Sequence, residues 1–590
     1  MSWEVWDMIS KTSFFNKGIY KSTLKRFVWG SVLYFAVLFL STTLSILLSS
    51  DIHYLHVPHD YFQNNPLIFR NNYFVIPMLL AIAVPSVVAV MVFRFIHSKN
   101  QAIFFHSLPV SRRANYISSV LASLTLMFVP IVLNGLSLMV VCLCGYGNYY
   151  TIFDCVLWIL NNVYAVFIMF SCACFAVNLT GNGFAAIIIN LIIHIFLFIL
   201  AASFESMADS FIYGYAGMDA LFEKIANNNF AYFAFSLSDT YFREKIEVWK
   251  LIEFALASLI LYFASYFLYK KRRLETAGDV AGFKCLNSIF KYFVTFLATA
   301  LCFTVFSSYI GEKNVVFIVI VAIISVVCYT ALEMILKKTL NVFYSWKGYL
   351  AFAFLFAVMI VFISQTSFMG YETRVPKADE IKEATVYNYY YKQEEPFTSN
   401  KEVINMAIKL HHEFTNGEIP KIKGRVNFTP DEPLTNLHIK YKLKDGSTLN
   451  RKYTVALNKT NLVMNDFYKI DEYKKKSEII FTEDSKITNA FIDHETKIDN
   501  YEELIEAIRK DVLALSYSEL YPENYDGYET IYSIRLQYNT KPEHLSLGEA
   551  IVNYNYISIN QRYVNAVKWL DENGYSNHRR QAVTISEQVD

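Results

Sequence analysis

Charged side chains are scarce in the first 370 residues of this 590-residue chain. Residues 1–370 contain 17 acidic and 24 basic residues, whereas residues 371–590 contain 35 acidic and 29 basic ones. Charged residues make up about 25% of a typical soluble domain, and only the second stretch reaches that density. The contrast predicts a membrane-embedded region followed by a soluble domain.

Cysteine is absent from residues 371–590, although the whole chain has eight cysteines. The soluble domain therefore lacks a disulfide framework and has to build a hydrophobic core of its own. Cys172 and Cys174 lie within an apolar run of the other region. Their surroundings predict small buried hydrophobic side chains rather than metal ligands.

The chain also lacks the motifs of common nucleotide-hydrolysing and hydrolytic enzymes. It has no G-x-x-x-x-G-K-[ST] loop, which would hold phosphate groups. G-x-S-x-G, H-E-x-x-H and the kinase motifs are missing as well. We therefore predict no catalytic, cofactor-binding or metal-binding residues and no enzymatic activity. Any active work would draw its energy from a partner or from a gradient.

Long apolar runs fill the first 370 residues. A membrane-spanning helix needs about 20 mostly apolar residues. This criterion predicts about nine spans, roughly at 27–48, 73–96, 116–144, 155–179, 183–203, 250–269, 291–310, 315–336 and 349–367. The fourth and fifth spans are separated only by "TGNG", residues 180–183, which predicts a tight turn.

The lysines and arginines of the short connections predict the orientation of the spans. They concentrate in residues 1–26 and in alternate connections, around 97–115, 270–290 and 337–347. Because such residues favour the cytoplasmic side, the N-terminus is predicted to be cytoplasmic. Nine spans would then place the soluble domain outside the cell membrane, whereas eight spans would place it inside.

The polar residues within the predicted spans are candidates for function. Intramembrane ionisable groups are functional candidates by default, and the candidates here are Arg94, Asn190, His194 and Glu333. Arg94 and Glu333 lie near predicted cytoplasmic ends, where extension of the side chain to the interface is the simpler explanation. For His194, a hydrogen bond between helices is favoured over a role in proton relay.

Two segments outside the spans are rich in aromatic residues. Residues 1–26 alternate aromatic and aliphatic residues with lysines, which favours an amphipathic helix in the membrane interface. The alternative is a basic flank that only sets the topology. No cleavable signal peptide is predicted, because no short apolar region with a cleavage site follows. The aromatic-rich connection 204–249 predicts short re-entrant or interfacial helices.

The connection 97–115 contains the stretch "FFHSLPVSRRANY". A plain positive-inside loop needs arginines but has no need of Phe-Phe-His-Ser-Leu-Pro. The pattern predicts a short, stiff protrusion that docks through apolar anchors, with arginines near anionic headgroups or acidic partner residues. The residues assigned to this site are Phe104, Phe105, His106, Leu108, Pro109, Arg112 and Arg113.

The order of these features resembles a type-2 ABC exporter permease. The segments at 1–26, 97–115 and 204–249 are similar to that family's amphipathic helix, coupling helix and re-entrant helices. The phrases "FHSLPVSRRANYISSVLASL" and "FMGYETRVPKADEI" resemble a Gram-positive subgroup with extra spans and a C-terminal soluble domain, of the kind encoded with YtrA-type regulators. The resemblance implies a six-span core at 27–270 and extra spans at 271–370.

The resemblance also implies partners and a function. An ABC ATPase subunit would bind ATP and dock on the 97–115 loop, and a second permease copy or paralogue would complete the complex. The cargo would be amphipathic: an antimicrobial peptide, a lipid or a drug. The alternative is a non-transporting permease for mechanotransmission or envelope-stress signalling through its extracellular domain. Membrane lipid is an expected partner, and nucleic acid is not.

Residues 371–590 predict an α+β domain. Helical spacing of apolar residues predicts helices at 399–415, 500–516 and 560–573. Alternation around Asp445-Gly446 predicts a hairpin, and further strands are predicted at 529–538 and 551–559. The "HHE" at 411–413 and the "DHE" at 493–495 are not predicted to bind metal, because neighbours on a helix point about 100° apart.

Overall fold

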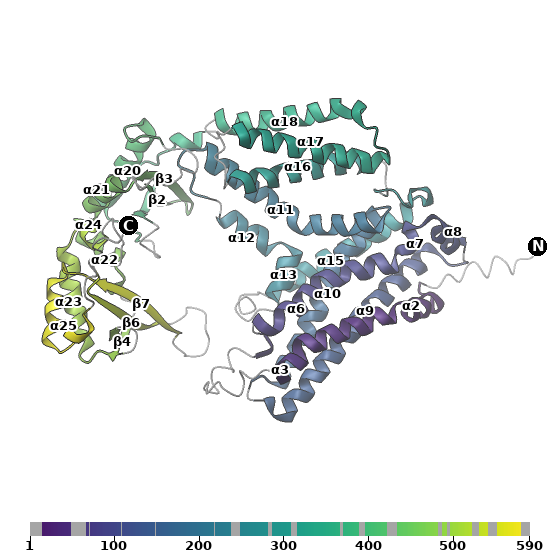
Figure 1. The fold of residues 1–590 in the computed structure, drawn as a ribbon, viewed down its shortest axis with the longest axis horizontal. Coiled ribbons are helices and arrows are strands. Elements are labelled where there is room, and N and C mark those ends of the chain that lie inside the picture. The colour runs from purple at the N-terminus through teal and green to yellow at the C-terminus, as the bar shows by residue number, and fades with distance from the viewer. Residues whose placement is uncertain are drawn as a thin grey trace, which may run out of the picture. The chain divides into compact units, whose positions relative to one another are not determined.

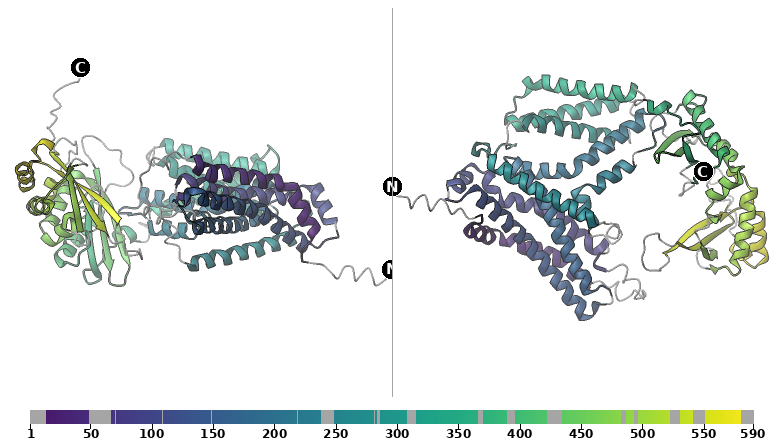
Figure 2. Two further views of the ribbon diagram at one scale, coloured as in Figure 1. Left: turned by 90° about the horizontal axis from the view of Figure 1, so that it is seen from below. Right: turned by 180° about the vertical axis from the view of Figure 1, so that it is seen from behind.

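The computed structural model describes most of the chain and divides it into two compact units. It describes residues 14–48, 67–69, 71–107, 109–147, 149–217, 219–237, 248–280, 282, 286–307, 315–365, 370–388, 396–421, 434–481, 486–492, 496–521, 530–540 and 551–579. The first unit comprises residues 1–206 and 218–356, and the second comprises residues 207–217 and 357–590. Figures 1 and 2 show both units as ribbons.

The first unit is built from long apolar helices. The main ones are α2 (Lys17–Phe39), α3 (Ser45–Leu48), α6 (Asn71–Val92), α9 (Arg112–Val141), α10 (Ile152–Leu179), α11 (Gly183–Phe211), α15 (Val248–Lys271), α16 (Leu286–Ser307), α17 (Val315–Lys337) and α18 (Trp346–Gln365). Shorter helices are α7 (Arg94–His97), α8 (Lys99–Ser107), α12 (Asp219–Asn227) and α13 (Phe230–Ser236). Helices α16, α17 and α18 lie side by side in Figure 1.

Eight helical segments within the described residues are long and apolar enough to cross a membrane. They correspond to the first eight predicted spans. The ninth prediction coincides with α18, whose apolar part, Trp346–Phe362, is shorter. The first unit is therefore a polytopic helical bundle compatible with a multi-pass membrane protein, and α18 alone separates a count of eight from a count of nine.

Buried amides connect the helices of this bundle. Asn134 of α9 donates to the Thr42 hydroxyl at 2.8 Å, beside the π-helical turn Leu40–Leu44 that joins α2 to α3. Asn178 of α10 donates to Ser265 of α15 at 3.0 Å. Between apolar helices, such bonds supply a specific attraction that hydrophobic side chains cannot supply in lipid. They fix which helix faces are neighbours.

The described part of the connection 204–249 contains helical structure. Helix α11 extends to Phe211, and α12 and α13 follow. Asn229 caps α13 and also donates to the carbonyl oxygen of His194 at 2.7 Å. The ring of Phe233 stacks on that of Phe254 in α15, with centroids 4.1 Å apart. Helix α13 is therefore packed into the bundle through its aromatic residues.

The second unit contains two antiparallel sheets with helices packed on them. One has the strand order β1-β2-β3 and the other β5-β4-β6-β7. The strands are β1 (Ile381–Asn388), β2 (Leu434–Leu443), β3 (Thr448–Ala456), β4 (Lys486–Ile492), β5 (Thr496–Lys497), β6 (Tyr532–Thr540) and β7 (Ile551–Ile559). The helices are α20 (Lys401–Asn416), α21 (Leu457–Tyr468), α22 (Asp471–Ser477), α23 (Tyr501–Ala514), α24 (Tyr517–Leu520) and α25 (Val564–Glu572).

The three helices and the hairpin predicted for this region are present. Gly417 ends α20 with a φ of 81°, and Gly446 turns the hairpin with a φ of 85°. Both positions need the left-handed backbone that glycine adopts without steric cost. The elements without a sequence-based prediction are β1, β4, β5, α21, α22 and α24. Short apolar runs of this kind fit a strand and a helix about equally well, so periodicity alone does not assign them.

Residues 207–217 belong to the second unit, although they are far in sequence from its other residues, 357–590. Tyr213 is only 2% exposed and belongs to the core beneath the first sheet. Its backbone N–H donates to the Glu372 carboxylate at 2.9 Å. Asp209 forms an ion pair with Lys452 at 2.6 Å, and the Lys452 N–H donates to the carbonyl oxygen of Gly214 at 3.2 Å. The second unit is thus discontinuous in sequence.

We expect Gly214→Ala to destabilise the second unit more than Gly446→Ala does. Both glycines have positive φ, 76° and 85°, where alanine costs about 1 kcal/mol or more. A Cβ at Gly214 would also lie 2.8 Å from the ring of Tyr453, whereas no described atom lies within 4 Å of one at Gly446. Temperature-ramped proteolysis of the full chain, scored by a C-terminal epitope, measures the unfolding temperature of each variant. Equal decreases in the two variants would contradict the packing described for residue 214.

Candidate functional site

The segment between α6 and α9 forms a short helical protrusion. Ser98 has extended backbone angles, φ −115° and ψ 124°, and separates α7 from α8. Ser111 begins α9 by accepting a hydrogen bond from the Ala114 N–H at 3.2 Å. Exposed Pro109 lies just before this cap. The predicted stiff element is therefore α8, held between a break at its start and a capped helix after its end.

The two phenylalanines of α8 point in different directions. Phe105 stacks on buried Phe95, with ring centroids 4.6 Å apart, and Ala102 is buried beside it. Ile103 and Phe104 are 63% and 61% exposed. Phe105, predicted to be a docking anchor, therefore packs inward, and the exposed apolar pair is Ile103 with Phe104.

For two other residues predicted at this site, the structure does not describe the side chain. Leu108 lies outside the described residues, and so does the side chain of His106. Ile103 is not among the residues predicted for this site. The signal that could have found it is its place in the apolar run Ile103-Phe104-Phe105, which is wider than one buried face of a short helix.

The two arginines of the stretch have internal contacts. Arg112 donates to the carbonyl oxygens of Lys270 at 2.8 Å and Arg272 at 3.3 Å. A cation at the last carbonyls of a helix stabilises that end, so Arg112 joins α9 to the end of α15. The Arg113 guanidinium lies 3.6 Å from the ring centroid of Phe14. Arg112 is thus committed to the fold instead of a lipid headgroup or a partner.

Arg272 connects two more elements, α7 and α10, at the same place. Its side chain is 6% exposed and donates to Val177 O at 3.4 Å and Ile96 O at 3.2 Å. Burial lowers the pKa of Arg272 to about 10, so the guanidinium is still charged at neutral pH. Beside it, burial and the Arg272 charge lower the pKa of His97 to about 4. His97 is therefore neutral, and its Nε2 lies 3.2 Å from Val177 O.

The "TGNG" turn packs against the loop that follows α15. Gly278 N–H donates to Gly181 O at 2.8 Å, and Gly282 N–H donates to Leu179 O at 2.9 Å. A Cβ on Gly181 would lie 2.3 Å from the carbonyl oxygens of both Asp279 and Thr276. Only glycine fits there. We call residues 96–107, 180–183 and 270–280 together the α8 platform.

The four polar residues predicted within the spans lie in different surroundings. Asn190 of α11 donates to Ser86 of α6 at 2.7 Å. The carbonyl oxygen of His194 accepts from Asn229. Arg94 is exposed. Glu333 belongs to the group of α16, α17 and α18. The described contacts do not join these residues into a relay.

Glu333 is buried, contrary to the expectation that its side chain extends to the interface. It is 4% exposed and pairs with Lys291 at 3.0 Å and Lys337 at 2.9 Å. Ser345 donates to the same carboxylate at 2.7 Å. A carboxylate among apolar helices is stable only when paired. Here the pairing ties α16 and α17 to the turn before α18.

The two motifs that could suggest a metal have different outcomes. His411 is fully buried and its Nδ1 lies 3.3 Å from the Tyr441 hydroxyl, whereas His412 is exposed. The two neighbours therefore point in different directions, as expected for adjacent residues of a helix. Residues 493–495 lie outside the described residues. The described part of the chain holds no group of three or more metal-ligating side chains.

Comparisons with protein-family models, with curated proteins and with solved structures found no match for this chain. The class of protein therefore follows from the fold itself. It is a polytopic bundle of apolar helices joined to a smaller unit that contains two sheets.

We expect the second unit to lose stability as the pH falls below about 6.5. Burial, with the charges of Arg451 and His412, lowers the pKa of His411 to about 3. An ordinary histidine titrates near 6.5. The unfolded chain then binds the extra proton, which costs about 2 kcal/mol at pH 5. Burial lowers the pKa of His438 to about 4, so this group also makes the second unit less stable as the pH falls.

The measurement is temperature-ramped proteolysis of the full chain between pH 5 and pH 8. His411→Gln should reduce the pH slope, because it removes the group that titrates on unfolding. His412→Gln is the matched control, since this neighbour is exposed. It should reduce the pH slope much less, because it removes only the smallest of the three causes that lower the pKa of His411. An unchanged slope in His411→Gln would contradict the assignment.

Proposed function

We propose that this chain is the transmembrane permease subunit of an ABC exporter and that α8 docks on a separate ATPase subunit. The observation that carries the proposal is the division of α8 into two faces. Its inner face is fixed by Phe105 on Phe95, while Ile103 and Phe104 are exposed. Exposed apolar anchors on a rigid base are typical of docking elements.

The base of α8 is suited to transmit force. Arg272 bonds to the ends of α7 and α10, and Arg112 bonds to the end of α15. A displacement of α8 would therefore act on several long helices through charged hydrogen bonds, which are stronger than neutral ones. ATP would be bound by the partner, in keeping with the missing phosphate loop.

The topology that accompanies this proposal follows the basic residues. The α8 platform carries arginines and lysines, which favour the cytoplasmic side. With nine spans, α18 crosses the cell membrane and the second unit lies outside. A second permease copy or paralogue would pair with this chain. The cargo would be amphipathic, because the spans offer apolar surfaces with few charges.

A second candidate function is mechanotransmission without transport, and the course of α11 favours it. This helix of 29 residues is about 44 Å long at 1.5 Å per residue. It begins at the "TGNG" turn of the α8 platform, and its last residues belong to the second unit. It contains no proline. Its end is held by Asp209 with Lys452. ATPase cycles could thus reach the second unit through one helix.

We expect Ile103→Ser with Phe104→Ser to abolish co-purification of the cognate ATPase. The substitutions remove the exposed apolar anchors without touching the buried base of α8, so membrane insertion and yield should be unchanged. Leu143→Ser is the matched control, because Leu143 is 72% exposed at the other end of the α9 region. It should leave the complex intact. A complex that survives the double substitution would show that α8 is not the docking element.

The role of α11 can be tested with a charge exchange. Asp209→Lys should weaken the anchor, because it places two cations together, and Asp209→Lys with Lys452→Asp should restore it. Hydrogen–deuterium exchange of residues 207–217 is compared with and without a trapped nucleotide on the ATPase. Mechanotransmission predicts that the nucleotide changes the hydrogen–deuterium exchange of residues 207–217 in the unmodified chain. This change should be lost in the single variant and regained in the double variant. ATP-dependent cargo transport by a chain lacking 371–590 would contradict it.

A further inference from the structure

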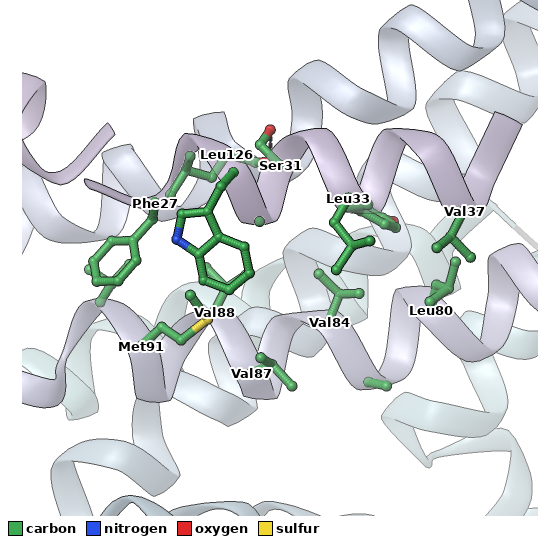
Figure 3. A pocket seen from close by; sticks show the side chains of 15 residues that line it. Phe27, Ser31, Leu33, Val37, Leu80, Val84, Val87, Val88, Met91 and Leu126 are labelled. Atoms are coloured by element: carbon green, nitrogen blue, oxygen red, sulfur yellow. Dashed lines mark hydrogen bonds between the residues drawn. The ribbon is translucent and has the colours of Figure 1, made fainter. Parts of the chain in front are cut away.

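An apolar groove runs along the first unit between α2 and α6 (Figure 3). Its volume is about 350 Å³, near the lower limit of about 300 Å³ for ligand sites. Phe27 and Leu33 of α2 face Val84 and Met91 of α6, and Leu126 of α9 contributes to the lining. None of these side chains carries a charge.

The groove is shaped like a slot for a narrow chain. Gly30 has no side chain to fill it, and a Cβ there would have Met91 Cε at 3.9 Å as its nearest neighbour. Trp29 and Leu33 form a wall and are each 58% exposed. The lining of α2 extends from Phe27 to Val37, which is about 15 Å along the helix axis.

One polar group in the groove lacks a partner. Ser31 donates to Leu126 O at 2.8 Å and is thereby satisfied. Tyr34 is 5% exposed, and its hydroxyl has no hydrogen-bond partner among the described residues. A buried hydroxyl without a partner costs about 1–3 kcal/mol. An occupant that offers a carbonyl oxygen would remove this cost.

Two exposed cations precede the groove. Lys25 and Arg26 directly precede Phe27, both are exposed, and neither forms an ion pair within the described part of the chain. Side chains of a helix lean towards its N-terminus, so the Tyr34 side chain leans towards this basic end. Clusters of basic residues beside spanning helices bind anionic lipid headgroups.

We infer that the groove binds one acyl chain of an anionic glycerophospholipid. The phosphate lies at Lys25 and Arg26, the ester carbonyl accepts from Tyr34, and the hydrocarbon chain follows the slot past Gly30. A second copy of this chain is a poorer occupant, because close helix contacts in membranes use small residues, and the walls here are Trp29 and Leu33. The inference is independent of the proposed transport function.

The test uses the full chain reconstituted with phospholipids whose acyl chains carry bromine, which quenches tryptophan fluorescence on contact. The fluorescence of Trp29 is obtained by subtracting the fluorescence of the Trp29→Phe variant from that of the unmodified chain. Trp249 of α15 is 53% exposed and reports ordinary lipid contact by the same subtraction. We expect half-quenching of Trp29 at a several-fold lower fraction of brominated phosphatidylglycerol than of brominated phosphatidylcholine, with no such difference at Trp249.

Two kinds of variant separate the parts of the site. Lys25→Gln with Arg26→Gln should remove the preference for phosphatidylglycerol at Trp29. Tyr34→Phe should weaken the binding of both lipids about equally, because both have the same ester carbonyl. Gly30→Leu should abolish the quenching of Trp29 at low fractions of brominated lipid, because the leucine side chain fills the slot. Equal quenching of Trp29 and Trp249 by both lipids would overturn the inference. So would protection of Trp29 from both lipids, which would assign the groove to a second copy.

Discussion

The buried guanidinium of Arg272 is the interaction on which the organisation of the helical unit depends. It donates to carbonyl oxygens at the ends of α7 and α10, and its own carbonyl accepts from Arg112 at the start of α9. A charge that is 6% exposed is tolerated only because carbonyl oxygens replace its water. Those carbonyls lack helical partners at the ends of their helices, so each group satisfies the other.

Contacts with neighbouring elements also explain why α8 can be a rigid protrusion. Its own length of nine residues is too short for a stable isolated helix. Packing of Phe105 on Phe95 and contacts of α8 with the turn Leu274–Thr276 supply the missing stability. The exposed pair Ile103 and Phe104 is then presented at a fixed position. This arrangement supports the proposal of a docking element better than the arginines do.

The second unit owes its unusual make-up to the end of α11. Residues 207–217 contribute a core tyrosine, an ion pair and a backbone hydrogen bond to it. One helix is therefore shared between the two units. In contrast, the groove between α2 and α6 belongs wholly to the helical unit. A lipid there would contact helices that the proposed coupling also moves, which gives the membrane a route to influence the protein.

The amino-acid sequence alone determined the class of architecture. Long apolar runs predicted the eight helical segments that, within the described residues, are long and apolar enough to cross a membrane, because span length is a local property of composition. The turn at Gly446 and the ends of α20 and α25 were equally local. The face that Phe105 occupies, the burial of Glu333 and the inclusion of residues 207–217 in the second unit were decided only by tertiary structure. Each depends on partners distant in sequence, such as Lys291 for Glu333 and Lys452 for Asp209, and one sequence carries no signal for such pairings.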